Sequence, residues 1–312
     1  MADPYPQLAA TFEPLIADAL NRAWDKLRKT GSLDQLSEAL QSDGVGGVLA
    51  YLRDIEPTLA AELVPVLEDA IIASGRAVVE ILPAGAQSGA FNFTLTQPQA
   101  AAYVRQYTFE LIREISTETV EAVRMAVQSG ILAGRNPRSI ARDFRASIGL
   151  TRAREETIQR YRAALEAGDA AYAASLSIND KRMLDAIQRG GLRQKQIDDY
   201  VNRARLRYVA QRTEVIARTE SLRAISIGQD QSIQQGQLLG VMSDRLGKEW
   251  LYRQDSRTRD THREIPGMNG QIPYNQPFQT PLGPLMFPRD PAGTAANTIQ
   301  CRCRMKIVLL PG

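Results

Sequence analysis

Hydrophobic residues recur at helical spacing along the first 82 residues. Leu20, Trp24 and Leu27 mark one face of a helix that Gly31 ends, and a longer apolar stripe runs over residues 59–81. Proline, glycine and alanine then interrupt the pattern. We predict an N-terminal helical region over 1–82, followed by a linker or extended arm over 83–95.

The helical pattern resumes and continues to residue 240. Asn136-Pro137 is typical of a helix start, and Thr151 opens a charged helix that ends near Gly168. Farther along, apolar side chains recur every seven residues and predict a long packing helix; they are Val201, Tyr208, Val215 and Leu222. We predict a central helical region over 96–240.

Helical periodicity disappears after residue 240, where proline and glycine cluster. Residues 248–252 predict a strand, and Asn269-Gly270 is a pair typical of a hairpin turn. Alternation between Cys301 and Leu309 predicts a half-buried strand. We therefore expect a small α+β module over 241–312. The predicted fold class is mainly α, with helical N-terminal and middle regions and this C-terminal module.

Composition narrows the class of protein. The 312 residues include 44% hydrophobic residues, which is enough for a folded core and argues against a disordered chain. No apolar run could span a bilayer, so we expect no membrane partner. The formal net charge of +3 is too small to indicate a partner. Cysteines as close as Cys301 and Cys303 rarely bridge, which favours synthesis in a reducing cytoplasm.

No standard catalytic motif appears. The chain lacks a glycine-rich phosphate loop, and any Ser–His or Cys–His mechanism would depend on its single histidine, His262. We expect no catalytic residue and no cofactor-binding residue.

His262, Cys301 and Cys303 allow two interpretations. They offer three zinc ligands, with Asp255 or Asp260 as a fourth, although C-x-C is tighter than the usual zinc spacing. Alternatively, both sulfur atoms lie on the inner face of the last strand as small buried hydrophobic groups.

Trp250 belongs to the same prediction. Its strand precedes His262, so we expect Trp250, His262, Cys301 and Cys303 to meet and hold the module together. We favour an apolar, hydrogen-bonded cluster without metal, and zinc remains the alternative.

Arginines gather on two stretches of the central region. The candidates for contact with DNA phosphates are Arg152, Arg154, Arg203 and Arg205. Acidic residues interleave with them, which is also the pattern of a solvated helix face. Contacts to the phosphates of double-stranded DNA would not read the base sequence, and no aromatic stacking platform indicates specific binding of single strands.

Arg218-Thr219-Glu220 lies within the predicted long helix, and Arg212-Thr213-Glu214 precedes it. The repeated triplet favours a packing role, in which buried ion pairs anchor a partner or the C-terminal module. Ordinary surface charge is the alternative, worth about 0.3–0.5 kcal/mol for each pair.

The C-terminal series resembles a known family. In order, it comprises Trp250, Asp255, Arg257, His262, Gly267, Pro288 and Cys301-Arg302-Cys303. Order and spacing are similar to the D-x-R-x-x-x-x-H to C-R-C signature of Mu F-like phage head morphogenesis proteins. The segment Ile216-Ala217-Arg218-Thr219-Glu220 is also similar, and the resemblance covers about residues 119–308.

The resemblance implies a minor virion protein rather than an enzyme. Such a protein associates with the phage portal protein and with capsid or scaffold proteins, and it enters the head during assembly; some relatives bind DNA without sequence preference. Two alternatives remain. One is an ADP-ribosyltransferase-like enzyme on the C-terminal module, with Arg218 and Glu220 as candidate residues. The other is a general nucleic-acid-binding assembly factor.

Overall fold

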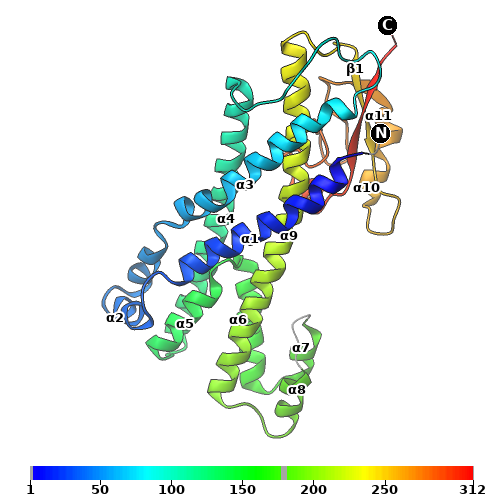
Figure 1. Cartoon of the computed structure of the whole chain (residues 1–312). Helices are drawn as coiled ribbons and strands as arrows, with labels where there is room; N and C mark the ends of the chain where they lie inside the picture. The colour runs from blue at the N-terminus through cyan, green and yellow to red at the C-terminus, as the bar shows by residue number, and fades with distance from the viewer. Residues whose placement is uncertain (1–2, 177–180, 312) are drawn as a thin grey trace. The chain divides into compact units, whose positions relative to one another are not determined.

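A computed structural model describes residues 3–176 and 181–311, and it is dominated by helices (Figure 1). The longer part of the chain forms α1 (Tyr5–Arg28), α2 (Leu33–Leu49), α3 (Ile55–Ala77), α4 (Pro98–Leu132), α5 (Pro137–Ser147), α6 (Arg152–Ala167), α7 (Ala170–Ser175), α8 (Lys181–Gln188) and α9 (Gln194–Leu238). Short 3-10 turns cover Ala50–Leu52 and Val78–Glu80.

The remainder forms β1 (Leu246–Leu251), α10 (Asp260–Arg263), α11 (Ile265–Asn269), β2 (Gln271–Pro273), α12 (Ala295–Thr298) and β3 (Arg304–Leu309). The predicted fold class, mainly α with a small α+β module at the C-terminal end, is confirmed. No helix within the described residues is both long and apolar enough to span a bilayer.

The chain forms two compact units, and each gathers stretches that are distant in sequence. Unit 1 combines residues 1–19, 63–109 and 215–312, and unit 2 combines residues 20–62 and 110–214. Helices α1, α3, α4 and α9 each contribute to both units.

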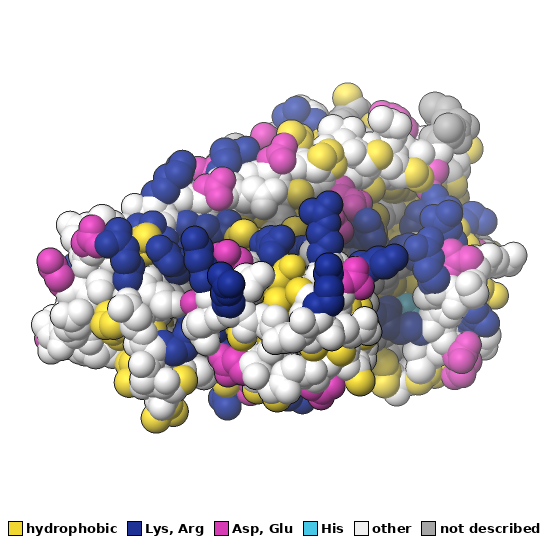
Figure 2. Space-filling model, turned by 90° about the horizontal axis from the view of Figure 1, so that it is seen from below, with side chains coloured by type: hydrophobic (Ala, Val, Ile, Leu, Met, Phe, Trp, Pro, Cys, Tyr) yellow, Lys and Arg dark blue, Asp and Glu magenta, His cyan; other side chains and the backbone are white. Residues whose placement is uncertain are grey.

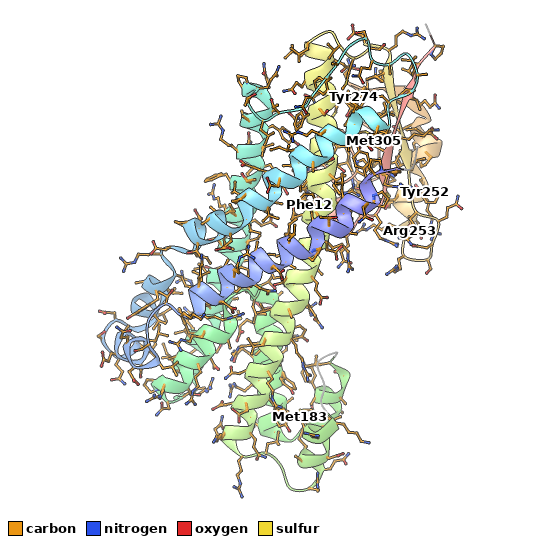
Figure 3. All side chains as sticks on the ribbon, in the orientation of Figure 1. Phe12, Met183, Tyr252, Arg253, Tyr274 and Met305 are labelled. Atoms are coloured by element: carbon orange, nitrogen blue, oxygen red, sulfur yellow. The ribbon has the colours of Figure 1, made fainter. Side chains whose placement is uncertain are left out.

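In unit 2, local signals in the sequence determine where helices begin and end. The side chain of Asn136 caps α5 ahead of Pro137, and Thr151 caps α6, which Gly168 ends at φ 71°. Helix α8 attaches to α6 through Met183, labelled in Figure 3, whose sulfur lies 3.0 Å from the hydroxyl of Tyr161. These predicted helix boundaries are confirmed.

In unit 1, α3 and α9 pack unusually closely. A Cβ atom on Gly228 would lie 2.2 Å from the carbonyl oxygen of Ile71, so only glycine fits there. Two serines link the helices: Ser74 donates to the carbonyl of Ile225 at 2.6 Å, and Ser232 donates to the carbonyl of Gly75 at 2.7 Å. Small and polar residues thus replace a purely apolar contact.

The segment before α4, predicted as a linker or extended arm, makes one isolated bridge, between Gln87 and Met242, and joins no sheet. Phe93 is fully buried against Gly75. The side-chain amide of Gln235 accepts a hydrogen bond from the backbone N–H of Thr94 and donates one to its carbonyl. A side chain of α9 therefore satisfies the backbone groups that a neighbouring strand would otherwise satisfy.

The three strands form an antiparallel sheet in the order β2-β1-β3. Along β3 the predicted alternation holds at its start, with Arg304 and Lys306 exposed and Met305 and Ile307 buried. The strand begins at Arg304, however, and not at Cys301 as predicted. The carbonyls of both cysteines accept hydrogen bonds from Arg289, so they do not join the ladder.

The prediction of a hairpin turn at Asn269-Gly270 is wrong. Asn269 is the last residue of α11, and Gly270 ends that helix at φ 61°. The Asn269 amide donates to the carbonyls of Ile265 and Gln279. Hairpin turns and helix ends both favour a residue with positive φ, so the pair by itself does not distinguish them.

Candidate functional site

His262, Cys301 and Cys303 converge inside the C-terminal module. His262 lies on α10, and the cysteines lie in the irregular segment between α12 and β3. Nδ1 of His262 is 3.5 Å from Sγ of Cys301 and 3.4 Å from Sγ of Cys303. The three potential ligand atoms lie within 4.8 Å of one another, and all three side chains are buried.

A chain of hydrogen bonds sets the orientation of the imidazole. The Thr280 hydroxyl donates to the carbonyl of Gly283 at 2.6 Å, so it must accept from the Asn297 amide nitrogen, 3.0 Å away. Oδ1 of Asn297 then faces Nε2 of His262 at 3.0 Å and requires a proton there. The neutral ring therefore turns its Nδ1 lone pair toward the two sulfur atoms.

Trp250, on β1, forms the apolar side of this cluster. It is fully buried, and its ring packs edge-to-face with His262 at 5.8 Å and with Phe278 at 5.3 Å. The structure thus brings together the four side chains that the sequence predicts to meet: Trp250, His262, Cys301 and Cys303.

Arg289, which sequence reasoning missed, lies beside the cysteines. Its guanidinium is buried and donates to the carbonyls of Cys301 and Cys303 and to the hydroxyl of Ser226. In the described part of the chain no carboxylate lies within ion-pair distance of it. A hydrogen bond from the Cys303 thiol, aided by His262 and Arg289, holds the pKa of the Cys301 thiol well below its ordinary value.

Asp255 and Arg302 form a separate pair at the edge of the cluster. Both guanidinium NH₂ groups of Arg302 donate to the carboxylate at 2.6 Å, and this contact is the main reason that the pKa of Asp255 falls below its usual range. Arg257 is exposed, and its backbone N–H bonds the same carboxylate. Asp255 is thus occupied elsewhere and Asp260 is exposed, so neither joins the cysteines as a fourth ligand.

The side chains of Arg218, Thr219 and Glu220, which form the motif, contact different neighbours. Arg218 is partly exposed and pairs with Glu13 at 3.1 Å. The hydroxyl of Thr219 accepts from the backbone N–H of Gln300 and so connects α9 to the cysteine segment. Glu220 is buried and accepts from the Tyr107 hydroxyl and from Arg223. Arg218 and Glu220 do not share a pocket, which gives no support to the ADP-ribosyltransferase alternative.

A second polar group in unit 1, also missed from the sequence, surrounds Lys248 on β1. Its ammonium donates to the carbonyl of Met286 at 2.7 Å and lies over the ring of Tyr274 (Figure 3). Tyr274 donates to Asp230 on α9 at 3.2 Å. Burial raises the pKa of Asp230 to about 6 and lowers the pKa of Lys248 to about 8.

The four arginines proposed to contact DNA differ in exposure. Arg152, Arg154 and Arg203 are exposed. Arg205 is completely buried, and it pairs with Asp143 and Glu155 at 2.6 Å. The expectation that Arg205 contacts DNA is therefore wrong, because its charge is fully used to join α5, α6 and α9.

Unit 2 also carries an arginine-lined groove that sequence reasoning did not single out. Its volume is about 370 Å³, and its lining includes Arg28, Arg142, Arg145 and Asn202. The Nε atoms of Arg28 and Arg145 are buried without a hydrogen-bond partner. Figure 2, a view from below relative to Figure 1, shows many Lys and Arg side chains with acidic ones between them.

The chain is similar to one known protein family. No curated protein and no solved structure matches it. One family model, described as Phage Mu protein F like protein, matches residues 177–306. The match contains α8, α9 and nearly all of the C-terminal module, including the histidine and both cysteines. Over residues 177–306 the chain is therefore similar to the phage Mu protein F like family.

Proposed function

We propose that this protein is a minor structural protein of a tailed phage head, which associates with the portal protein and is incorporated during capsid assembly. The family match over 177–306 carries the proposal. The organisation of the module supports it: among the buried residues of the family motif, Thr219 bonds α9 to the cysteine segment, and His262 contacts Cys301 inside the module, which suits a structural part.

Co-expression with the portal protein of the same phage tests this proposal. The two proteins should co-purify through size exclusion, and mass spectrometry of purified heads should find the chain at low copy number. Absence of the chain from both procapsids and mature heads would contradict the proposal.

A second candidate function is sequence-independent contact with packaged DNA. The arginine-lined groove supports it, because the side chains of Arg28, Arg142 and Arg145 line it and no acidic residue does. Phosphate oxygens are suitable acceptors for such groups. Arg142 stands at this groove and is exposed, as Arg203 is on α9.

A mobility-shift assay with two unrelated duplexes at several salt concentrations tests the DNA contact. Binding should be equal for both duplexes and weaken steeply with salt, by a slope of about 0.9 for each phosphate contacted. The R142Q/R203Q double variant should lower affinity and slope. The matched control, R105Q/R113Q, removes two exposed arginines of α4 and should leave both unchanged. Equal losses in the two double variants would contradict a site at the groove.

A further inference from the structure

We propose that His262, Cys301 and Cys303 bind a zinc ion, so that the C-terminal module is held by a metal. The sequence alone favours a metal-free cluster, whereas the geometry of the structure favours a metal site. The inference is independent of the portal and DNA proposals, because it concerns atoms inside one module.

The two nitrogen–sulfur separations already match those of a zinc site. With Zn–N of about 2.0–2.1 Å and Zn–S of about 2.3 Å in a tetrahedral site, nitrogen and sulfur lie about 3.5 Å apart. The observed Nδ1–Sγ distances are 3.5 Å to Cys301 and 3.4 Å to Cys303. The third separation, between the two sulfur atoms, is within 4.8 Å, against about 3.8 Å in a tetrahedral zinc site, so binding needs at most a shift of about 1 Å between them.

The nitrogen–sulfur distances would also suit hydrogen bonds between the thiols and the imidazole. The number of sulfur atoms that face Nδ1 favours a metal ion instead. Nδ1 of His262 has one lone pair, yet two sulfur atoms face it, and a thiol is a weak donor. A single lone pair accepts from one thiol and leaves the other to donate to the neighbouring sulfur atom, which is a weak acceptor. A cation accepts the nitrogen and both sulfurs at once.

The surroundings are those of a ligand histidine. Metal-bound imidazoles commonly donate their second N–H to an oxygen that fixes the ring, and Asn297 does so here, held in turn by Thr280. Arg289 places a buried positive charge beside the two cysteines, where it offsets the charge of two thiolates. A carboxylate for Arg289 is lacking among the described residues, so thiolates are the anions available to it.

The position in the fold explains what the metal would do. Within the described residues between β2 and β3 the short helix α12 is the one regular element, and apart from the bridge of Phe278 with Leu285 the backbone hydrogen bonds inside this stretch are local turns. A small module with little core gains stability from a local cross-link. A zinc ion would join α10 to the segment that leads into β3. Three protein ligands leave the fourth position to a water molecule.

The test uses the full chain, produced in medium with added zinc and then desalted. Elemental analysis should find about one zinc per chain. Replacement by cobalt(II) should give thiolate-to-cobalt absorption in the near ultraviolet and d–d bands in the visible. C301S, C303S and H262A should each lose most of the metal, and N297A should weaken its affinity by about 10–100-fold.

R302K is the matched control, because Arg302 lies between the two cysteines but turns to Asp255, and it should keep the full metal content. Where a ligand variant fails to fold, the wild-type chain decides: chelation should lower its melting temperature and zinc should restore it. Wild-type protein without zinc and without cobalt bands overturns the proposal. Equal zinc in the wild type and in a folded C301S/C303S/H262A variant also overturns it.

Discussion

Asp230 and Lys248 are two ionisable side chains in the interior of unit 1. Both are almost completely removed from water, and the neighbours that face Asp230 are Lys248, Asp290, Tyr274 and the two glutamines Gln231 and Gln234. The hydroxyl and amide donors stabilise the carboxylate, but burial outweighs them and raises its pKa to about 6. Folding therefore favours the protonated form of Asp230.

This shift predicts a pH dependence of stability. Between its ordinary pKa, 3.8, and about 6, Asp230 binds a proton more tightly in the folded than in the unfolded chain, so its contribution falls as pH rises through that window. The two-unit difference corresponds to about 3 kcal/mol. Urea unfolding of the wild type and of D230N at pH 4 and pH 7 measures it. Because part of this window lies below pH 4, the wild type should lose about 2.5 kcal/mol relative to D230N between the two pH values, and an unchanged difference would contradict the burial argument.

At the scale of elements, the contact between α3 and α9 depends on Gly228. Alanine normally stabilises a helix interior relative to glycine, but here its methyl group would meet the carbonyl of Ile71 and the side chain of Ser74. We expect G228A to destabilise the protein by about 1–3 kcal/mol in thermal or urea unfolding.

Gly267 in α11 is the control for this substitution. A Cβ atom there meets nothing within 4 Å, and its φ is not positive, so G267A should be neutral or stabilise by up to about 1 kcal/mol. Equal effects of G228A and G267A would show that helix propensity, and not the close approach of α3, decides both.

Elements whose signals are local were predictable from sequence. Asn136, Thr151 and Gly168 act on backbone groups within a few residues, and they end or begin helices as expected. The prediction at Asn269 was wrong because the Asn-Gly pair is compatible with both a hairpin turn and a helix end. The predicted start of β3 was wrong because Arg289, twelve residues before Cys301, donates hydrogen bonds to the cysteine carbonyls.

The candidate site likewise combines features that the local sequence predicts with features that depend on residues distant along the chain. The meeting of His262 with the cysteines followed from strand order and alternation. Asn297, Arg289 and Lys248 carry no sequence pattern that marks them, because their importance comes from burial beside groups that are distant along the chain. Arg205 is the opposite case, a residue that a sequence pattern marked wrongly. It lies in a run of arginines, and nothing in that run predicts that two acidic residues enclose it.

At the scale of the whole molecule, the family match does not coincide with a unit. It contains most of α9 and the C-terminal module, yet the buried part of α9 in unit 1 packs on α3, outside the match. We predict that residues 96–312 alone do not fold stably. Circular dichroism and limited proteolysis should show reduced helix content and rapid cleavage, and adding residues 1–95 separately should restore protection. A protease-resistant fragment that unfolds cooperatively would contradict this prediction.

The discontinuity of unit 1 also has a consequence in time. Ser232 and Gly75, which bond one another across α9 and α3, are 157 residues apart. At about 5–20 residues per second, a ribosome needs roughly 8–30 s to make the second partner after the first. During that interval the apolar face of α3, including Leu67 and Ile71, lacks its partner on α9. We expect nascent chains stalled in this interval to bind the chaperones of the host, and chains stalled beyond β3 to be released from them.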